Sequence, residues 1–265
     1  MKTILITGST DGIGKLTAIK LAENGHHIIV HGRNADKLKD AISEIKAKAT
    51  NEKVSGFVSD FSDFDTIKKM IEEISNEFPS IDVLINNAGV FNSPKEKTND
   101  GLDIRFAVNY FAPYLLTNGL LSNLKNSTSS RIINLSSAAQ SSVNIEALAG
   151  NKQLSTQEAY AQSKLALTMW SFAFARANPE IITIAVNPGS LLNTKMVQEA
   201  YGQYWSSADK GATILYQLAT SNKYEDASGK YFDNDKGAFS TAHSDAYQQE
   251  KINELILKTN SILNQ

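Results

Sequence analysis

The sequence has no cysteine among its 265 residues. This absence excludes disulfides, thiolate zinc sites and a thiol nucleophile, and it is typical of a reducing compartment. Neither sign of charge dominates, because 26 basic residues are scattered among 28 acidic ones, so we expect no nucleic-acid or membrane-surface role. No apolar run approaches the roughly 18 residues of a membrane span. Only Met1 and Lys2 precede the first predicted strand, and we expect a cytoplasmic protein with no integral membrane segment and no metal site.

Three closely spaced glycines mark the segment around which the chain is organised. Residues 4–6 are an apolar run typical of a strand buried on both faces, and after Gly14 apolar residues return at helical spacing. Glycines between a strand and a helix let the backbone approach a ligand, while the helix N–H groups point into the turn. The spacing Gly-x-x-x-Gly-x-Gly differs from the usual dinucleotide fingerprint, so an ordinary tight turn is the alternative. The favoured interpretation is a phosphate site made by Gly8, Ser9, Thr10, Asp11, Gly12, Ile13 and Gly14.

The second predicted strand, residues 26–31, ends at Gly32, Arg33 and Asn34. With the first strand and helix it predicts a βαβ unit with a right-handed crossover. Such units usually place an acidic residue here for the adenosine ribose, whereas this chain has Gly32 followed by Arg33. A guanidinium binds a 2′-phosphate that a carboxylate would repel, so Arg33 and Asn34 favour NADP(H) over NAD(H). The charge of Asp11 argues mildly the other way, and Arg33 could instead be a solvated residue that opens the next helix.

Asp60 and Phe61 follow the third predicted strand, residues 54–59. An acidic residue at the carboxyl edge of a parallel strand could bond the adenine amine of a dinucleotide. Asp60 could equally cap the helix that is predicted from about residue 63 to residue 77. Both interpretations stay open at this point.

The fourth predicted strand, residues 81–85, runs into Asn86, Asn87, Ala88 and Gly89. Small residues beside two amides at a strand edge indicate backbone that packs closely against a flat ligand. We expect the asparagine side chains to bond neighbouring strands together, and an ordinary turn is the alternative.

Pro113 lies inside a helix that is predicted from Phe106 onward. Proline has no N–H, so the carbonyl of Asn109, four residues earlier, loses its helical partner and the helix should kink. We predict that Asn109 presents this free carbonyl to a water molecule of an active site.

Tyr160 and Lys164 lie four residues apart in a helix predicted from residue 159, so they share one helical face. The polar segment 140–158 precedes this helix. Further strands are predicted over 131–135, 181–186 and 229–232, and a final helix over 247–263.

Residues 190–209 show little sheet or core pattern and indicate a lid or the wall of a substrate pocket. This segment carries Tyr201, Tyr204 and Trp205. These aromatic residues either line an apolar pocket or belong to the core.

In this order, the motifs resemble the short-chain dehydrogenase/reductase family over nearly the whole chain. They are Thr7 with the glycine turn, Asp60, Asn86-Asn87-Ala88-Gly89, Asn109, Ser136-Ser137, Tyr160 with Lys164, and Pro188-Gly189. Arg33, the long segment before Tyr160 and residues 229–232 are most similar to the retinol-dehydrogenase-like branch. The resemblance implies an α/β, Rossmann-like, doubly wound sheet of about seven mostly parallel strands flanked by helices. It also implies hydride transfer between NAD(P) and an alcohol or carbonyl, and a homodimer or homotetramer.

The resemblance also implies roles for single residues. Tyr160 is the general acid/base, Ser137 polarises the substrate oxygen, and Asn109 anchors a water that links Lys164 to solvent. Lys164 in addition bonds the nicotinamide ribose. The family motif selects the second serine of the pair, since adjacent residues on a strand face opposite ways.

The implied cofactor contacts beyond the glycine turn and Arg33 include the segment 87–89, and one of them departs from the family. The family's carboxamide-binding threonine falls on Asn193, so we assign that role to Thr194, one residue later. The remaining contacts are Asp60, Phe61, Asn87, Ala88, Gly89, Tyr160, Lys164, Pro188 and Gly189.

A tyrosine with an ordinary pKa of about 10 is a poor base near neutral pH. An ammonium at about 4 Å, with an effective dielectric of about 20, contributes on the order of 4 kcal/mol, or roughly three pKa units. Lys164 is the one candidate at the right spacing from Tyr160.

The expected function is therefore an NADP(H)-dependent oxidoreductase for a hydrophobic alcohol or carbonyl, with NAD(H) as the second cofactor choice. A catalytically silent NADP-binding regulatory or scaffold module of the same fold is the alternative. A nucleotide-sugar epimerase is less favoured, because such sequences usually carry a longer C-terminal substrate domain. We find no repeat or linker and expect a single domain, with a nucleotide-binding half (residues 1–135), a catalytic half (136–265) and a lid (190–209).

Overall fold

One sheet organises the computed structural model, which describes residues 1–263 apart from the side chain of Tyr201. Its strands are β1 (Thr3–Ile6), β2 (His27–Gly32), β3 (Val54–Val58), β4 (Val83–Asn86), β5 (Arg131–Leu135), β6 (Ile182–Asn187), β7 (Lys230–Asp233) and β8 (Ala238–Ser240). The order across the sheet is β3-β2-β1-β4-β5-β6-β7-β8; β1 to β7 are parallel and β8 is antiparallel to β7. The doubly wound α/β fold is confirmed, and β8 is an eighth strand that the sequence did not predict.

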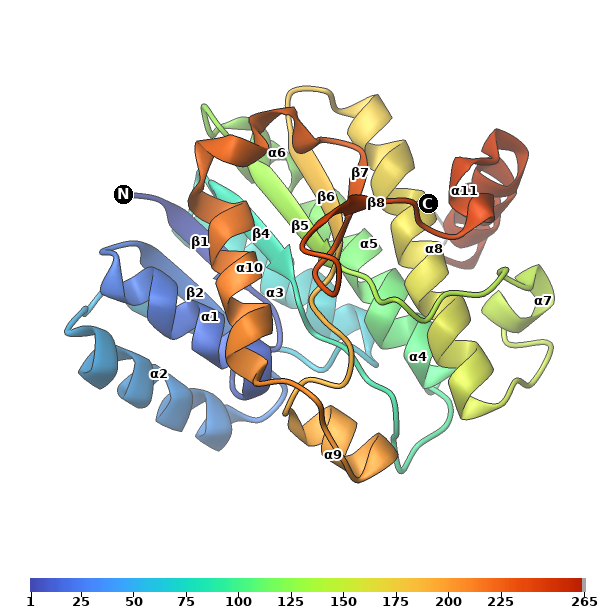
Figure 1. The fold of residues 1–265 in the computed structure, drawn as a ribbon, viewed down its shortest axis with the longest axis horizontal. Coiled ribbons are helices and arrows are strands. Elements are labelled where there is room, and N and C mark those ends of the chain that lie inside the picture. Colours follow the sequence, from blue (N-terminus) through green and yellow to red (C-terminus); the bar gives the residue numbers. More distant parts are fainter. Residues whose placement is uncertain (264–265) are drawn as a thin grey trace.

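Helices cover both faces of the sheet. They are α1 (Gly12–Glu23), α2 (Ala35–Ala49), α3 (Phe64–Glu77), α4 (Ile104–Phe106), α5 (Ala112–Gly119), α6 (Leu121–Lys125), α7 (Ile145–Leu148), α8 (Thr156–Ala177), α9 (Lys195–Tyr201), α10 (Ala208–Thr220) and α11 (Gln249–Leu263). Short 3₁₀ helices lie at η2 (Asn222–Ala227) and η3 (Ser244–Tyr247). Figure 1 shows α1, α2 and α10 on the near face and α3, α5 and α8 on the far face.

The first strand shows why its residues are all apolar. Ile4, Leu5 and Ile6 are fully buried. Because alternate residues of a strand face opposite ways, Ile4 and Ile6 pack with the helices of the near face while Leu5 packs with those of the far face. A parallel strand covered on both faces has no solvent side, which confirms the prediction from the apolar run.

The helix that carries Tyr160 begins earlier than predicted. Ser155 caps α8, because its hydroxyl accepts from the Glu158 N–H while the Glu158 carboxylate accepts from the Ser155 N–H. This capping box starts the helix at Thr156, three residues before the predicted start. The segment 140–158 also contains the short helix α7.

Pro113 follows a π-helical turn, η1 (Ala107–Phe111), which interrupts the predicted helix. The Ala112 N–H donates to the Ala107 carbonyl, five residues earlier, and Pro113 then occupies the first turn of α5. The first turn of a helix tolerates proline, and the kink stays a prediction.

The predicted last helix is present as α11, which begins two residues later than expected and packs over this region. Hydroxyls of Tyr110 and Tyr114 bond Thr259 and Asn260 of α11 at 2.7 and 2.5 Å. Within residues 1–263, no helix combines the length and the apolar character needed to cross a membrane.

Candidate functional site

The glycine turn lies at the carboxyl ends of β1 and β4, where the strand order reverses. Gly8 and Gly12 have positive φ angles of +61° and +56°, which L side chains rarely adopt. A Cβ on Gly8 would lie 2.7 Å from the Cα of Ala88, so this turn packs directly against the segment after β4. Asp11 caps α1 by accepting from the Gly12 N–H at 2.7 Å.

Gly14 is required for a different reason, because its φ is ordinary. A Cβ there would lie 2.4 Å from the Asn87 side-chain nitrogen and 2.5 Å from the Gly8 carbonyl oxygen. That amide donates to the carbonyls of Thr7 and Gly8 at 2.8 and 2.9 Å. Because it has no Cβ, Gly14 leaves room for the Asn87 side chain, which bonds the backbone of the turn.

Asparagines join the strands as predicted. The Asn86 amide on β4 donates to Asn134 on β5 at 2.7 Å and to Thr117 at 3.1 Å. The Thr7 hydroxyl accepts from the Asn87 N–H at 3.0 Å, so β1 and the end of β4 are bonded side chain to backbone. The segment 86–89 is thereby fixed relative to the glycine turn.

The end of β2 has no room for a side chain at Gly32. A Cβ there would lie 2.4 Å from the Thr10 methyl group. Arg33, the next residue, is exposed. Asn34, predicted as a cofactor contact, uses its side-chain oxygen to cap α2 by accepting from the Lys37 N–H at 2.9 Å.

One of the two interpretations of Asp60 is wrong, because Asp63 caps α3. The Asp60 carboxylate instead accepts from the N–H and hydroxyl of Ser62, at 3.0 and 2.8 Å. The Phe61 ring is buried and stacks on the His31 ring at a centroid distance of 4.2 Å.

His31 is a residue that the sequence analysis missed. Its Nδ1 accepts from the Gly8 N–H at 3.0 Å, and its Nε2 lies 3.0 Å from the Ser59 carbonyl, to which it donates. Burial lowers the pKa of His31 to about 4, so the ring is neutral near pH 7. The imidazole thus fixes the first glycine of the turn to the ends of β2 and β3.

Tyr160 and Lys164 project from α8 toward the segment after β4. The Lys164 Nζ lies 5.6 Å from the centre of the Tyr160 ring and donates to the Leu135 carbonyl at 2.8 Å. Lys164 is buried, which lowers its pKa to about 8. A Cβ on Gly89 would lie 3.5 Å from this nitrogen and 3.3 Å from the Asn109 side-chain oxygen. The structure therefore brings Tyr160, Lys164, Asn109 and Gly89 together.

Asn109 on the π-helical turn uses its side chain as a bridge. Its oxygen accepts from the Val90 N–H at 2.7 Å, and its nitrogen donates to the Val90 carbonyl and to the Ser163 hydroxyl, both at 3.0 Å. The role proposed for its backbone carbonyl stays a prediction.

The two serines after β5 lie in different surroundings. The Ser136 hydroxyl is buried and bonds Thr168 of α8 at 2.6 Å. Ser137 is partly exposed, and its hydroxyl accepts from the Ala139 N–H at 3.1 Å. The hydroxyl of Tyr231 on β7 donates to the Ser137 carbonyl at 3.0 Å, so the strand β7 holds the backbone of this serine.

The predicted lid, residues 190–209, contains α9 and reaches across the glycine turn. A Cβ on Gly12 would lie 3.7 Å from the Thr194 methyl group, and one on Gly89 would lie 3.7 Å from the end of Met196. Thr194 also caps α9. The Asn92 amide donates to the Glu199 carbonyl at 3.1 Å and links the lid to the segment after β4.

Asp235 anchors the first residues of the lid and was also missed. Its carboxylate accepts from the N–H and hydroxyl of Ser190, at 2.9 and 2.5 Å, and from Asn187 at 2.9 Å. Burial raises the pKa of Asp235, but these hydrogen bonds outweigh burial and hold it below the usual range. The Pro188 carbonyl accepts from Asn234 at 2.8 Å, and Gly189 has a φ of +128°.

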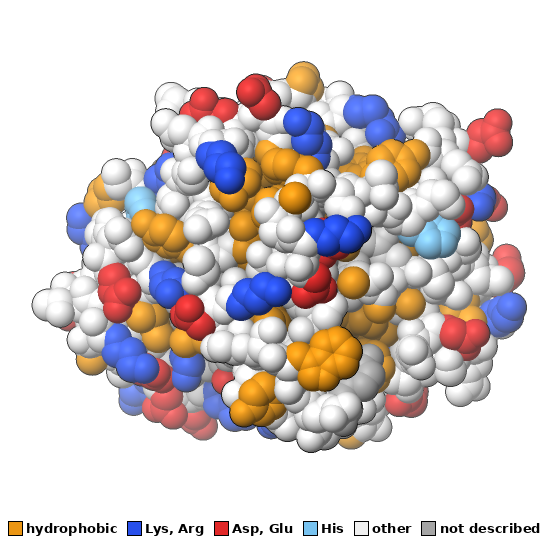
Figure 2. Space-filling view, in the orientation of Figure 1, with side chains coloured by type: hydrophobic (Ala, Val, Ile, Leu, Met, Phe, Trp, Pro, Cys, Tyr) orange, Lys and Arg blue, Asp and Glu red, His pale blue; other side chains and the backbone are white. Residues whose placement is uncertain are grey.

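Two aromatic residues of the lid are not core, whereas the side chain of the third, Tyr201, lies outside the described part of the structure. Tyr204 is 51 % and Trp205 72 % exposed, which overturns the core interpretation for both. Figure 2 shows hydrophobic side chains gathered over α9 and the segment that follows it, on a face where both signs of charge are interspersed.

Known proteins are similar to this chain in sequence and in fold. Residues 2–205 match the family model for short chain dehydrogenases. The chain is similar to human polyprenol dehydrogenase (32 % identity, covering 89 % of this chain and 77 % of the relative) and to human retinol dehydrogenase 13 (34 %, covering 88 % and 76 %). It is also similar to the crystal structure of a Shigella flexneri short chain dehydrogenase complexed with NADP, with a TM-score of 0.71, 25 % identity, and 88 % and 97 % of the two chains covered.

Proposed function

Because the chain belongs to the short-chain dehydrogenase/reductase family of oxidoreductases, in its retinol-dehydrogenase-like branch, we propose that it transfers hydride between NADP(H) and an alcohol or carbonyl, with Tyr160 as general acid/base. The observation that carries the proposal is the buried Lys164 ammonium beside the Tyr160 ring. A surface pair would be screened by water, whereas this lysine is removed from solvent and held by a carbonyl.

The position of the charge sets the direction of the effect. The Lys164 ammonium lies 5.6 Å from the centre of the Tyr160 ring, where a positive charge favours the phenolate. We therefore propose that Lys164 lowers the pKa of Tyr160 below its ordinary value, so that this group can give and take protons nearer to neutral pH. With its own pKa of about 8, Lys164 is mostly protonated at pH 7.

Ser137 and Asn109 have supporting roles in the proposal. The hydroxyl of the partly exposed Ser137 holds and polarises the substrate oxygen. The Ser136 hydroxyl is buried and is already bonded to the Thr168 hydroxyl. Asn109 fixes Val90 and Ser163, and through its backbone carbonyl it anchors the water that links Lys164 to solvent.

The glycine turn fits a dinucleotide. Positive φ angles at Gly8 and Gly12 present backbone without side chains at the N-terminus of α1, where phosphate is favoured. Gly32 has no acidic side chain for the ribose, and we assign the exposed Arg33 to the 2′-phosphate. When bound, NADP(H) supplies or accepts the hydride, Thr194 bonds its carboxamide, and residues 87–89 with Pro188 and Gly189 line its nicotinamide end.

The proposed substrate is a hydrophobic alcohol or carbonyl. Two relatives are named for polyprenol and retinol, and the predicted lid exposes Tyr204 and Trp205. The division into two functional halves, the cytoplasmic location and the homodimer or homotetramer stay predictions.

The test is to mix the protein with NADPH and a panel of aldehydes and ketones and to follow the loss of nicotinamide absorbance. Turnover of any carbonyl supports the oxidoreductase. Tight NADPH binding without turnover of any panel member would favour the silent regulatory or scaffold module instead.

The cofactor preference has its own test. Replacing Arg33 by Ala should weaken NADPH binding about 30-fold and leave NADH binding within about twofold, because the guanidinium contacts only the extra phosphate. Lys39→Ala, which removes an exposed cation from the helix that follows Arg33, α2, is the control and should change neither. Equal losses for both cofactors would contradict the assignment.

A further inference from the structure

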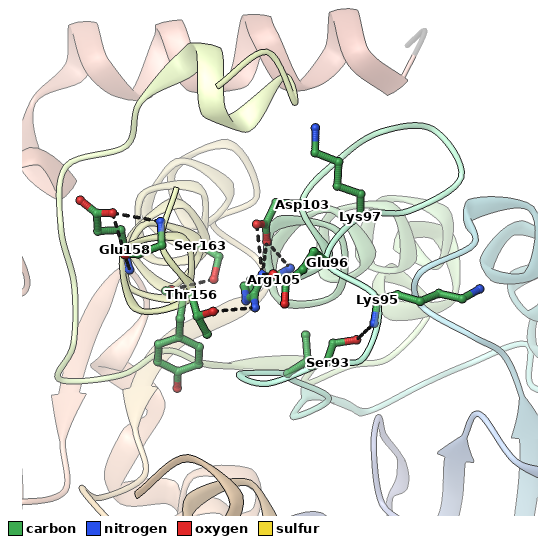
Figure 3. Close-up of polar contacts among 12 residues, drawn as sticks. Ser93, Lys95, Glu96, Lys97, Asp103, Arg105, Thr156, Glu158 and Ser163 are labelled. Atoms are coloured by element: carbon green, nitrogen blue, oxygen red, sulfur yellow. Dashed lines mark hydrogen bonds and ion pairs between the residues drawn. The ribbon is translucent and has the colours of Figure 1, made fainter. Parts of the chain in front are cut away.

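Arg105 is a fully buried charge that the proposed chemistry does not use. Its Nη1 bonds the Glu96 carboxylate at 2.5 Å and the Asp103 carboxylate at 3.2 Å. Its Nη2 donates to the Thr156 hydroxyl and its Nε to the Phe91 carbonyl, both at 3.0 Å. Figure 3 shows Arg105 between Thr156 on one side and Asp103 and Glu96 on the other, while the ends of Lys95 and Lys97 point away.

The two neutral partners of Arg105 lead to Tyr160 from both directions. Thr156 begins α8 and lies one helical turn before Tyr160 on the same face. Phe91 belongs to the segment between β4 and α4, and its ring contacts the Tyr160 ring at a centroid distance of 4.9 Å. The guanidinium therefore bonds both the backbone of Phe91 and the helix that carries Tyr160. The Phe91 and Tyr160 rings in turn contact each other.

A second set of hydrogen bonds holds the neighbouring residue, Val90. Asn109 holds Val90 by both its N–H and its carbonyl, and it also donates to Ser163. The Ser163 hydroxyl in turn donates to the Tyr160 carbonyl at 2.7 Å. Residues 90 and 91 are thus held against the same face of α8, at Thr156 and at Ser163 two turns later, by two independent side chains.

If Arg105 served only to stabilise the segment between β4 and α4, it would not need to bond Phe91 and Thr156. Glu96 and Asp103 neutralise the guanidinium, and the remaining contacts go to the carbonyl of the residue whose ring lies beside Tyr160 and to α8. The result is an aromatic ring of fixed position against the ring of Tyr160, the proposed acid/base. Such a ring contacts flat apolar groups better than puckered ones of equal size.

We propose that Phe91 is a specificity-determining residue, which favours carbonyls that carry a flat aromatic group, and that Arg105 is the positioning residue which sets its ring against Tyr160. This inference rests on the proposed function. Its substrate pair is benzaldehyde and cyclohexanecarbaldehyde, which have the same carbon framework but differ in flatness.

The first measurement is kcat/KM for this pair in the NADPH-dependent reduction. The wild type should prefer benzaldehyde, and Phe91→Ala should lower kcat/KM for benzaldehyde about tenfold, mainly through KM, while cyclohexanecarbaldehyde and NADPH affinity change less than about twofold. Phe91→Tyr, which keeps the ring, should retain the preference.

The second measurement tests whether Arg105 acts through Phe91. Thr156→Val removes one partner of the guanidinium and should reduce the aromatic preference about threefold, but should reduce it no further when combined with Phe91→Ala. Ser155→Ala is the matched control, because it removes the cap of the same helix without touching Arg105, and it should lower stability with the preference unchanged. Thr156→Val is used first because Arg105→Met leaves two carboxylates without their partner.

The outcomes separate the inference from the proposed function. No turnover of any carbonyl contradicts both. A wild type that reduces other carbonyls but shows no preference for benzaldehyde, a preference that survives Phe91→Ala, or additive effects of Thr156→Val and Phe91→Ala contradict the inference alone.

Discussion

The cofactor side and the substrate side of this site are built differently. The cofactor side, residues 7–14 and 86–89, is packed backbone against backbone, with glycines whose missing side chains leave room for their neighbours, and it is bonded internally by side chains of Thr7, His31 and Asn87. The substrate side, residues 90–103 and 190–209, is held by single polar side chains: Arg105, Asn109, Asn92 and Asp235.

This difference decides how each side responds to change. Backbone packed against backbone cannot yield, so a single added methyl group on the cofactor side should cost both stability and binding. A segment held by side chains can lose one bond and keep the others. Substitutions there should change substrate kinetics more than folding.

Gly14→Ala should have the largest effect. Its Cβ would meet the Asn87 side chain and the Gly8 carbonyl at about 2.5 Å, so we expect a loss of about 3 kcal/mol in unfolding free energy and loss of NADPH binding. Denaturant unfolding and NADPH titration measure the two effects. Gly25→Ala, where nothing lies within 4 Å of the new Cβ but φ is +77°, should cost only about 1 kcal/mol and leave binding intact. Equal losses of unfolding free energy and of NADPH binding in the two variants would contradict the claim that the close contacts at Gly14 cause the larger effect.

His31 should make stability fall in mild acid. Its native pKa is about 4, below the unfolded value near 6.5, so the unfolded state takes up the proton first as pH falls. The stabilisation is complete above pH 6.5, declines as pH falls toward 4, and amounts to about 2 kcal/mol between pH 7 and pH 5. Unfolding curves at the two pH values measure it.

His31→Gln is the informative variant for this pH dependence. Glutamine can accept from Gly8 and donate to Ser59 but does not titrate, so the decline should shrink by most of that amount. His26→Gln removes a less buried histidine and should change the decline little. An unchanged decline in His31→Gln would show that His31 does not cause it.

Asp235→Asn should have the smallest effect on folding and a visible one on kinetics. The charge strengthens three hydrogen bonds to Ser190 and Asn187, so its loss should loosen the lid and raise KM about fivefold, equivalent to about 1 kcal/mol. The free energy of unfolding should change by less than about 0.5 kcal/mol, and the exposed Asp226→Asn should change neither quantity. A large loss of stability with unchanged KM would show that the lid responds to substitution as the cofactor side does, and would contradict the comparison.

The same difference explains what could be predicted from the sequence. Gly8, Gly12 and Gly14 have a spacing that a turn requires, and Tyr160 and Lys164 have a spacing that one helical face requires. Such local relations can be recognised in a chain without its fold.

Arg105 and Asp235 have no comparable signal. Asp235 lies in a polar stretch that resembles a solvated surface, and Arg105 is a single charge between apolar residues. Some of their partners lie up to about fifty residues away in sequence, as Thr156 does from Arg105, so only the fold brings them together. The capping role considered for Asp60 was wrong because Asp63, three residues later, supplies the same chemistry at the true helix start. The sequence around Tyr204 and Trp205 has no regular hydrophobic period, so it does not distinguish an exposed lid from a buried core.

The central claim is that Tyr160 does the proton chemistry and that the glycine turn binds the cofactor independently. The most direct measurement compares wild type and Tyr160→Phe for both NADPH affinity and carbonyl reduction in one buffer. We predict that affinity stays within about threefold while kcat falls by at least about 100-fold. Near-normal turnover in Tyr160→Phe would contradict the account.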